Sequence, residues 1–75
     1  MRFSEVIDSV QFDFVSMNVK EPQLYQVYVN YDGQQYRFHM QINDSGAFKI
    51  TDERNCPHSY KELTPELNAA IFHHL

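Results

Sequence analysis

The sequence is poor in cysteine, glycine and long apolar runs, and each scarcity excludes a class of protein. Its one cysteine, Cys56, rules out a disulfide within the chain and fits a reducing compartment. Both glycines, Gly33 and Gly46, are explained by turns, which leaves none for a loop that cradles phosphate. No apolar run approaches the roughly 18 residues that span a bilayer, and residues 1–5 do not resemble a signal peptide. We therefore expect a soluble, cytoplasmic protein with no membrane partner.

Positive charge is also scarce, and it is scattered along the chain. Six Lys and Arg residues against ten Asp and Glu residues give a formal net charge of −4. The basic residues occur singly, so the chain has no basic stripe to hold a phosphate backbone, and we expect no binding to duplex nucleic acid. A chain of 75 residues suffices for one domain, which we place over residues 1–75.

Two neighbouring strands with a definite register are the strongest structural signal. The dipeptide Asp32-Gly33 is favoured in a two-residue type I′ turn, because both central residues need positive φ. A slip of one residue would turn every side chain of a strand to the other face, so the register is tightly specified. Counting outward from the turn places all apolar pairs on one face: Val29 with Tyr36, Val27 with Phe38, and Tyr25 with Met40.

A third strand is predicted after a second turn. If residues 44–46 form a three-residue loop with Gly46 in the left-handed conformation, Ile42 pairs with Phe48 on the same apolar face. A four-residue loop would instead set Ile42 against Ala47 and turn Phe48 to the opposite face. The three-residue loop keeps the apolar face continuous, so we favour it.

The C-terminal segment is predicted to be a helix that begins near Thr64. Thr64 can cap this helix, Pro65 suits its first helical position, and Glu66 favours the positive end of the helix dipole. About eleven residues are marginal alone in water, so the helix must dock on the sheet or on a second copy of the protein. Its apolar surface comprises Leu63, Leu67, Ala70, Ile71 and His74, widened by Phe72 and Leu75.

The N-terminal third fits two patterns. One is a helical face that starts near Ser4 and comprises Phe3, Val6, Ile7, Val10, Phe14 and Met17. The other is a strand from about Val10 to Val19 with a β-bulge at Phe14-Val15, followed by a turn over residues 20–23. The density of Val and Phe favours the strand, which leaves Ser4 to Ser9 as a short helix or an irregular lead-in.

These elements predict an α+β fold in which a three- to four-stranded antiparallel β-meander is covered on its apolar face by the C-terminal helix. Catalysis finds little support. No third group is specified to orient His58 beside Cys56, and no serine sits in a nucleophile elbow. A meander this small has scant room for a pocket of ~300 Å³. We therefore expect a protein that is not an enzyme and that carries no cofactor.

The candidate metal ligands are Cys56 and His58 in the long connection, with His73 and His74 at the C-terminus, because zinc prefers thiolate and imidazole. The pattern is weak. Only one cysteine is present, and adjacent residues on a helix point about 100° apart. We expect no native metal site, and a metal- or ligand-binding module is the alternative function.

The leading prediction for function is a small, non-catalytic module for protein–protein interaction or regulation that forms a homodimer. The last strand, Ala47 to Thr51, would offer an edge that tends to pair, although Lys49 on that strand can also act against pairing. Phe72 and Leu75 leave apolar surface that one sheet does not cover. Both features favour a protein partner or a second copy of the chain.

The predicted sheet face opposite the core gathers a further set of candidate interaction residues. Tyr28 stands opposite Arg37, where a cross-strand cation–π contact is expected, and His39 lies beside them. Aromatic and basic residues on such a face are typical of proteins that stack single-stranded nucleic acid, which is our second alternative. With few cations on an acidic protein, we favour recognition of another protein by this face.

Overall fold

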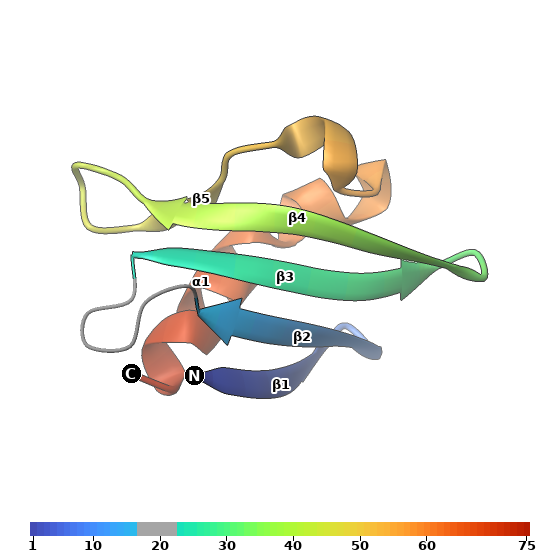
Figure 1. Cartoon of the computed structure of the whole chain (residues 1–75), viewed down its shortest axis with the longest axis horizontal. Helices are drawn as coiled ribbons and strands as arrows, with labels where there is room; N and C mark the ends of the chain where they lie inside the picture. The colour runs from blue at the N-terminus through green and yellow to red at the C-terminus, as the bar shows by residue number, and fades with distance from the viewer. Residues whose placement is uncertain (17–22) are drawn as a thin grey trace.

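A computed structural model describes residues 1–16 and 23–75, and this part of the chain forms a five-stranded antiparallel sheet with one α-helix across it (Figure 1). The strands pair in chain order, β1-β2-β3-β4-β5, so the sheet is a meander. The α+β class is confirmed, with five strands where three to four were predicted. The elements are β1 (Arg2–Ile7), β2 (Val10–Ser16), β3 (Leu24–Tyr31), β4 (Gln34–Ile42), β5 (Phe48–Ile50), the 3₁₀ helices η1 (Glu53–Asn55) and η2 (His58–Leu63), and α1 (Thr64–His73).

The predicted register of the central hairpin is confirmed. Tyr31 pairs with Gln34 across the turn, and the pairing continues without offset to Leu24 and Gln41. The two turn residues, Asp32-Gly33, have φ angles of 53° and 76°, which is the positive pair that a type I′ turn requires.

The second turn also has the predicted geometry. Ile42 pairs with Phe48, and Gly46 takes the left-handed conformation with φ at 81°. Asn43 braces the loop, because its Oδ1 accepts hydrogen bonds from the backbone N–H groups of Ser45 and Ala47. The four-residue alternative is therefore wrong.

The N-terminal segment is a second hairpin, so the predicted short helix or lead-in from Ser4 to Ser9 is wrong. β1 pairs with β2 around a two-residue turn, Asp8-Ser9, whose φ angles are 54° and 66°. β2 stays in register with β3 through Ser16, so the bulge predicted at Phe14-Val15 is also wrong. The rest of the strand predicted to reach Val19, and most of the turn after it, lie outside the described residues.

The helical pattern in this segment is misleading because a tight hairpin spaces its core residues much as a helix face does. Val6 lies on the face of the sheet away from α1, and 66% of it is exposed. The other described residues of the pattern do face the core: Phe3 and Ile7 share one side of β1, and Val10 and Phe14 share the same side of β2, because the two-residue turn pairs Ile7 with Val10.

Helix α1 docks on the sheet as predicted, with Leu67, Ala70 and Ile71 buried against it. Thr64, however, is not its cap. It is already helical, with φ −49° and ψ −45°, and its Oγ1 donates to the carbonyl oxygen of Lys61 at 2.7 Å. The physical reason is that η2 runs directly into α1, so no extended residue precedes the helix where a cap would sit.

The core lies between α1 and the sheet and is rich in aromatic rings, some packed edge to face and some stacked. The ring of Tyr25 meets that of Phe48 at a centroid distance of 5.4 Å, and Phe14 stacks on Phe3 at 4.6 Å. Among the described residues, the hydroxyl of Tyr25 is the one buried side-chain polar atom without a hydrogen-bond partner, and burial raises its pKa. The largest fully buried side chains are Tyr25, Phe12, Phe14, Phe38, Phe48, Met40, Leu67, Ile71 and Val27.

Candidate interaction surfaces

The sheet has one face without a covering layer in the described chain, and we call it the open face. Figure 1 looks onto this face, with α1 behind the sheet. Alternation along each strand assigns its residues, because neighbours in a strand point to opposite faces. Three of them are basic and one is acidic, on a protein with a net charge of −4. They are Arg2, Ser4, Val6, Gln11, Asp13, Val15, Leu24, Gln26, Tyr28, Asn30, Gln35, Arg37, His39, Gln41 and Lys49.

The structure brings four of the six predicted interaction residues onto this face. Tyr28 pairs with Arg37 in the sheet, as predicted, and His39 and Lys49 lie on the same side. The Tyr28 hydroxyl donates to Oε1 of Gln26 at 3.1 Å. Within the described residues, the ring of Tyr28 makes no cation–π contact with Arg37, so that part of the prediction is wrong. The exposed Arg37 side chain is left to solvent.

His39 is the most organised side chain of the open face, because Asp52 holds it at two points. The backbone N–H of His39 donates to Asp52 Oδ1 at 2.6 Å, and Nδ1 of its ring lies 2.8 Å from Asp52 Oδ2. Asn55 Nδ2 also donates to Oδ2. Burial acts to raise the pKa of Asp52, but these hydrogen bonds outweigh it and hold the pKa below its ordinary 3.8. A ring fixed at Nδ1 keeps its Nε2 for other partners.

β5 lies at one edge of the sheet, as the sequence predicted, but little of that edge is available for pairing. The strand has only three residues. The backbone N–H of Phe48 donates to Oδ1 of Asn68 on α1 at 2.7 Å. The helix therefore shields this edge with one of its own side chains.

β1 forms the other edge, and sequence reasoning missed it because a helix or lead-in was expected there. Ile7 and Val10 flank a two-residue turn, so they exchange backbone hydrogen bonds with each other. In an antiparallel pair every second residue of β1 therefore bonds to β2: Ile7, Glu5 and Phe3. The bond from Ser16 N–H to the carbonyl oxygen of Met1 fits the same alternation. The N–H and C=O groups of Arg2, Ser4 and Val6 therefore point away from β2. In Figure 1, no strand or helix of the described chain lies beyond β1 in the plane of the sheet.

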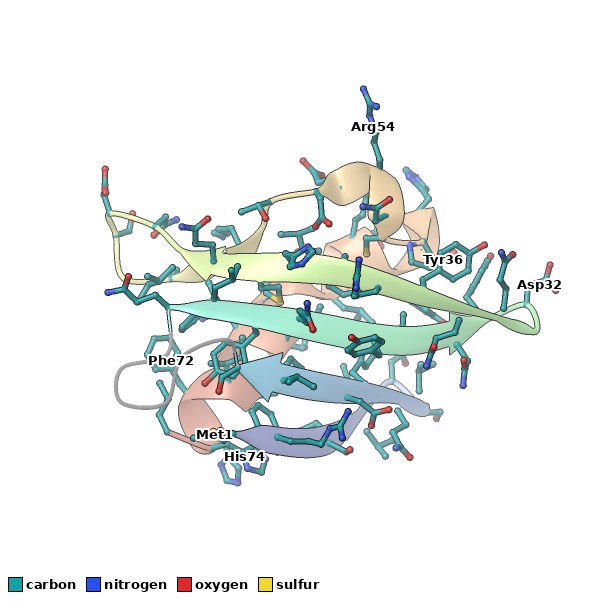
Figure 2. The ribbon with its side chains drawn as sticks, viewed as in Figure 1. Met1, Asp32, Tyr36, Arg54, Phe72 and His74 are labelled. Carbon is teal, nitrogen blue, oxygen red and sulfur yellow. The ribbon has the colours of Figure 1, made fainter. Side chains whose placement is uncertain are left out.

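The end of α1 contacts the covered side of β1 through His74. The ring of His74 stacks on Phe3 at a centroid distance of 4.0 Å, and its Nε2 lies 3.1 Å from Oε1 of Glu5. The remaining predicted interaction residues, Phe72 and Leu75, are at this end of the molecule and away from the open face. Phe72 is 46% exposed, Leu75 57% and Met1 48%. Figure 2 shows Met1, Phe72 and His74 at one end of the molecule, and we call Met1, Phe72, His74 and Leu75 the terminal corner.

The four candidate metal ligands are not brought together. Cys56 is buried in the core, where burial raises the pKa of its thiol to about 11, and its Sγ donates to the carbonyl oxygen of Pro57. His74 is bound to Glu5 at the far end of α1, and the exposed His58 begins η2. Within residues 1–16 and 23–75, no group of three or more His, Cys, Asp or Glu side chains is placed to hold a metal ion.

The fold and these surfaces define a class: a two-layer α+β domain with one uncovered sheet face and one uncovered edge strand. Comparisons with protein-family models, with curated proteins and with solved structures found no match for the chain. None of the helices in the described ranges is long and apolar enough to cross a membrane.

Proposed function

We propose that this chain is a small non-catalytic module for protein–protein interaction, acting in the cytoplasm as a homodimer. The observation that carries the proposal is β1, a six-residue edge strand whose outward backbone groups no other part of the described chain engages. An edge of this kind is a ready template for another strand. The opposite edge is shielded by Asn68, so the two edges are not equivalent.

Exposed apolar side chains beside this edge support the same reading. Val6 stands 66% exposed on the open face of β1, and Met1, which is 48% exposed, directly precedes the strand at its other end. Isolated apolar side chains on a surface need no explanation, so these residues support an association along β1 only because they flank its unpaired backbone groups at both ends.

The contacts of the ionisable residues support a non-catalytic role. The thiol of Cys56 is in the core with a pKa of about 11, so almost none of it is the reactive thiolate at neutral pH. His39 and His74 each hold a carboxylate within the fold, through Asp52 and Glu5. These contacts join segments of the chain to one another.

Native mass spectrometry of untagged protein, purified without chelators and followed over a concentration series, tests the proposal. We expect a metal-free dimer whose mass is twice that of the chain, dissociating on dilution. A monomer at the highest soluble concentration would contradict the homodimer, and a monomer that carries one zinc ion would favour the metal-binding alternative based on Cys56.

The charge of the open face favours a second candidate, the binding of single-stranded nucleic acid. Arg2, Arg37 and Lys49 lie on this face against Asp13 and the Asp52 carboxylate that holds His39, and Tyr28 offers one ring for a base to stack on. We expect any such affinity to fall with salt and to be lost in Arg37→Ala, with Arg54→Ala as a control off the face. No measurable binding of a labelled oligonucleotide at low salt would remove this candidate.

A further inference from the structure

The geometry of β1 points to a specific partner, and we propose that it is β1 of a second copy, paired antiparallel about a two-fold axis at Ser4. This inference rests on the proposed homodimer and adds the surface and the register. The pairing would join two five-stranded sheets into one continuous sheet. The occupant is argued from the charges along β1 and from the positions of its outward backbone groups.

The outward groups determine which registers are possible. Only residues whose N–H and C=O both point outward can exchange hydrogen bonds with a second copy, and in β1 these are Arg2, Ser4 and Val6. Centring the pair on Ser4 sets Arg2 opposite Val6 of the second copy and Ser4 opposite Ser4. All three residues of each copy then take part, which gives roughly six backbone hydrogen bonds across the seam. Every other symmetric register leaves at least one of the three unpaired.

The charges on β1 select the same register. Moving the axis to Glu5 would place two glutamates directly opposite each other, which is destabilising. With the axis at Ser4, Glu5 instead faces Phe3 of the second copy and Arg2 faces Val6, so no like charges stand opposite each other. The side chain at the axis itself is an uncharged serine whose Oγ donates to Asp13 of its own chain at 2.6 Å.

The exposed apolar residues beside β1 fit this arrangement too. On the covered side, Met1 would lie opposite Ile7 of the second copy, at both ends of the seam. The end of α1 lies over β1 through the contact of His74 with Phe3, so Leu75 is placed near the seam. Because the axis is perpendicular to the sheet, both helices lie on one side and both open faces on the other. The dimer therefore presents one wide polar surface for a further partner.

The first test replaces Ser4, because its outward N–H can be removed without breaking the β1–β2 pairing. Proline is tolerated on an edge strand where the missing N–H faces outward. We expect Ser4→Pro to be a monomer at concentrations where the wild type is a dimer. Ser4→Ala is the matched control, because it also loses the hydrogen bond to Asp13 but keeps the N–H, and it should remain a dimer.

The second test crosslinks the axis and does not require that the proline variant folds. In the proposed register, the Cα atoms of the two Ser4 residues lie about 5.5 Å apart, within the range of disulfides. We expect Ser4→Cys to form a covalent dimer under mild oxidation, whereas Ser45→Cys in the loop before β5 should not. The buried Cys56 can stay in both variants.

Failure of the register and failure of the proposed function are distinguishable. If the wild type is a dimer but Ser4→Pro stays dimeric and Ser4→Cys does not crosslink, the interface lies elsewhere and the homodimer survives. If the wild type is a monomer throughout the concentration series, both the homodimer and the β1 seam are wrong. If β1 pairs only with a strand of a different protein, the second copy is the wrong occupant.

Discussion

β5 and β1 close the same sheet at its two ends, and the chain protects them by different means. β5 is short, and a side chain from α1 accepts the hydrogen bond of its Phe48 N–H. β1 is twice as long. The helix contacts it only on its covered face, through the stacking of His74 on Phe3, so its outward backbone groups keep no partner in the described chain. A helix can therefore hold an edge strand in place without shielding the edge. Contact with the side chains of a strand and coverage of its backbone are separate properties.

The largest expected effect comes from removing the shield of β5. In Asn68→Ala, the N–H of Phe48 loses its acceptor in a partly buried position, so we expect the free energy of unfolding to fall by about 2 kcal/mol. Urea denaturation measures this change. Asn68→Asp keeps an acceptor oxygen and should lose less. Ser4→Ala, which deletes an exposed hydrogen bond at the β1 edge, should change stability by no more than about 0.5 kcal/mol. If Asn68→Ala and Ser4→Ala lowered the free energy of unfolding equally, the two edges would not differ in how they are protected.

The second effect concerns Asp52, which ties the segment after β5 back to β4. Asp52→Ala deletes its hydrogen bonds to His39 and Asn55 and should lower the free energy of unfolding by about 1.5 kcal/mol at neutral pH. A carboxyl whose pKa is lowered by folding stabilises the protein above its ordinary pKa, here 3.8, and this contribution is lost as the pH falls through the folded value. The difference in the free energy of unfolding between Asp52→Ala and the wild type should therefore shrink below pH 3.8. A difference that stays constant into acid would contradict this role, and Asp44→Ala in the exposed loop is the control.

The third effect tests how β1 is held. His74→Ala removes the stacking on Phe3 and the contact with Glu5, so we expect a loss of about 1 kcal/mol, mostly from the aromatic pair. Hydrogen exchange of the β1 amides should speed up more than that of β4. His73→Ala is the neighbouring control: its exposed ring meets the edge of the His74 ring at 5.2 Å, and its variant should lose less stability than His74→Ala. A similar loss in both variants would mean that the helix end matters for β1, rather than the His74 ring.

The smallest effect is a gain in stability at the β1–β2 turn. Ser9 has a φ of 66°, a conformation that glycine adopts at no steric cost, whereas Gly33 already fills the matching position between β3 and β4. Ser9→Gly should raise the free energy of unfolding by about 0.5 kcal/mol, as measured by urea denaturation. The reverse change, Gly33→Ser, should lower it by a similar amount. A loss on Ser9→Gly would show that the serine side chain stabilises this turn.

The two hairpins also show what could be predicted from the sequence. Asp32-Gly33 predicts its turn because glycine favours positive φ. Only one register puts all the apolar residues around that turn on the same face. Asp8-Ser9 takes the same conformation with no glycine, and the core residues on either side of it, Phe3, Ile7, Val10 and Phe14, keep a spacing that a helix face also gives. Local pattern therefore located β3, β4 and β5 but not β1. The length of the meander, and with it the second edge, depended on that one turn.

The contacts that organise the candidate surfaces were beyond sequence reasoning for a different reason. His39 meets Asp52 at a separation of 13 residues, and His74 meets Glu5 at 69. Nothing in the local sequence around either histidine marks its partner, because each pair forms only when the sheet and the connecting helices are in place. The open face was predictable because it follows from alternation within strands, whereas its anchoring to the loop after β5 was not.

Because Cys56 is buried, the reactivity of its thiol measures how often the core unfolds. Thiol reagents react with thiolate, and this thiol is 4% exposed with a pKa of about 11, so the folded chain should be almost inert to them. Labelling then proceeds only through molecules that have transiently unfolded around the core. With one thiol per chain, the labelling rate at a given reagent concentration reports the fraction of molecules that are unfolded around the core. If association stabilises the fold, the labelling rate should fall as the protein concentration rises. One labelling experiment then follows both stability and assembly.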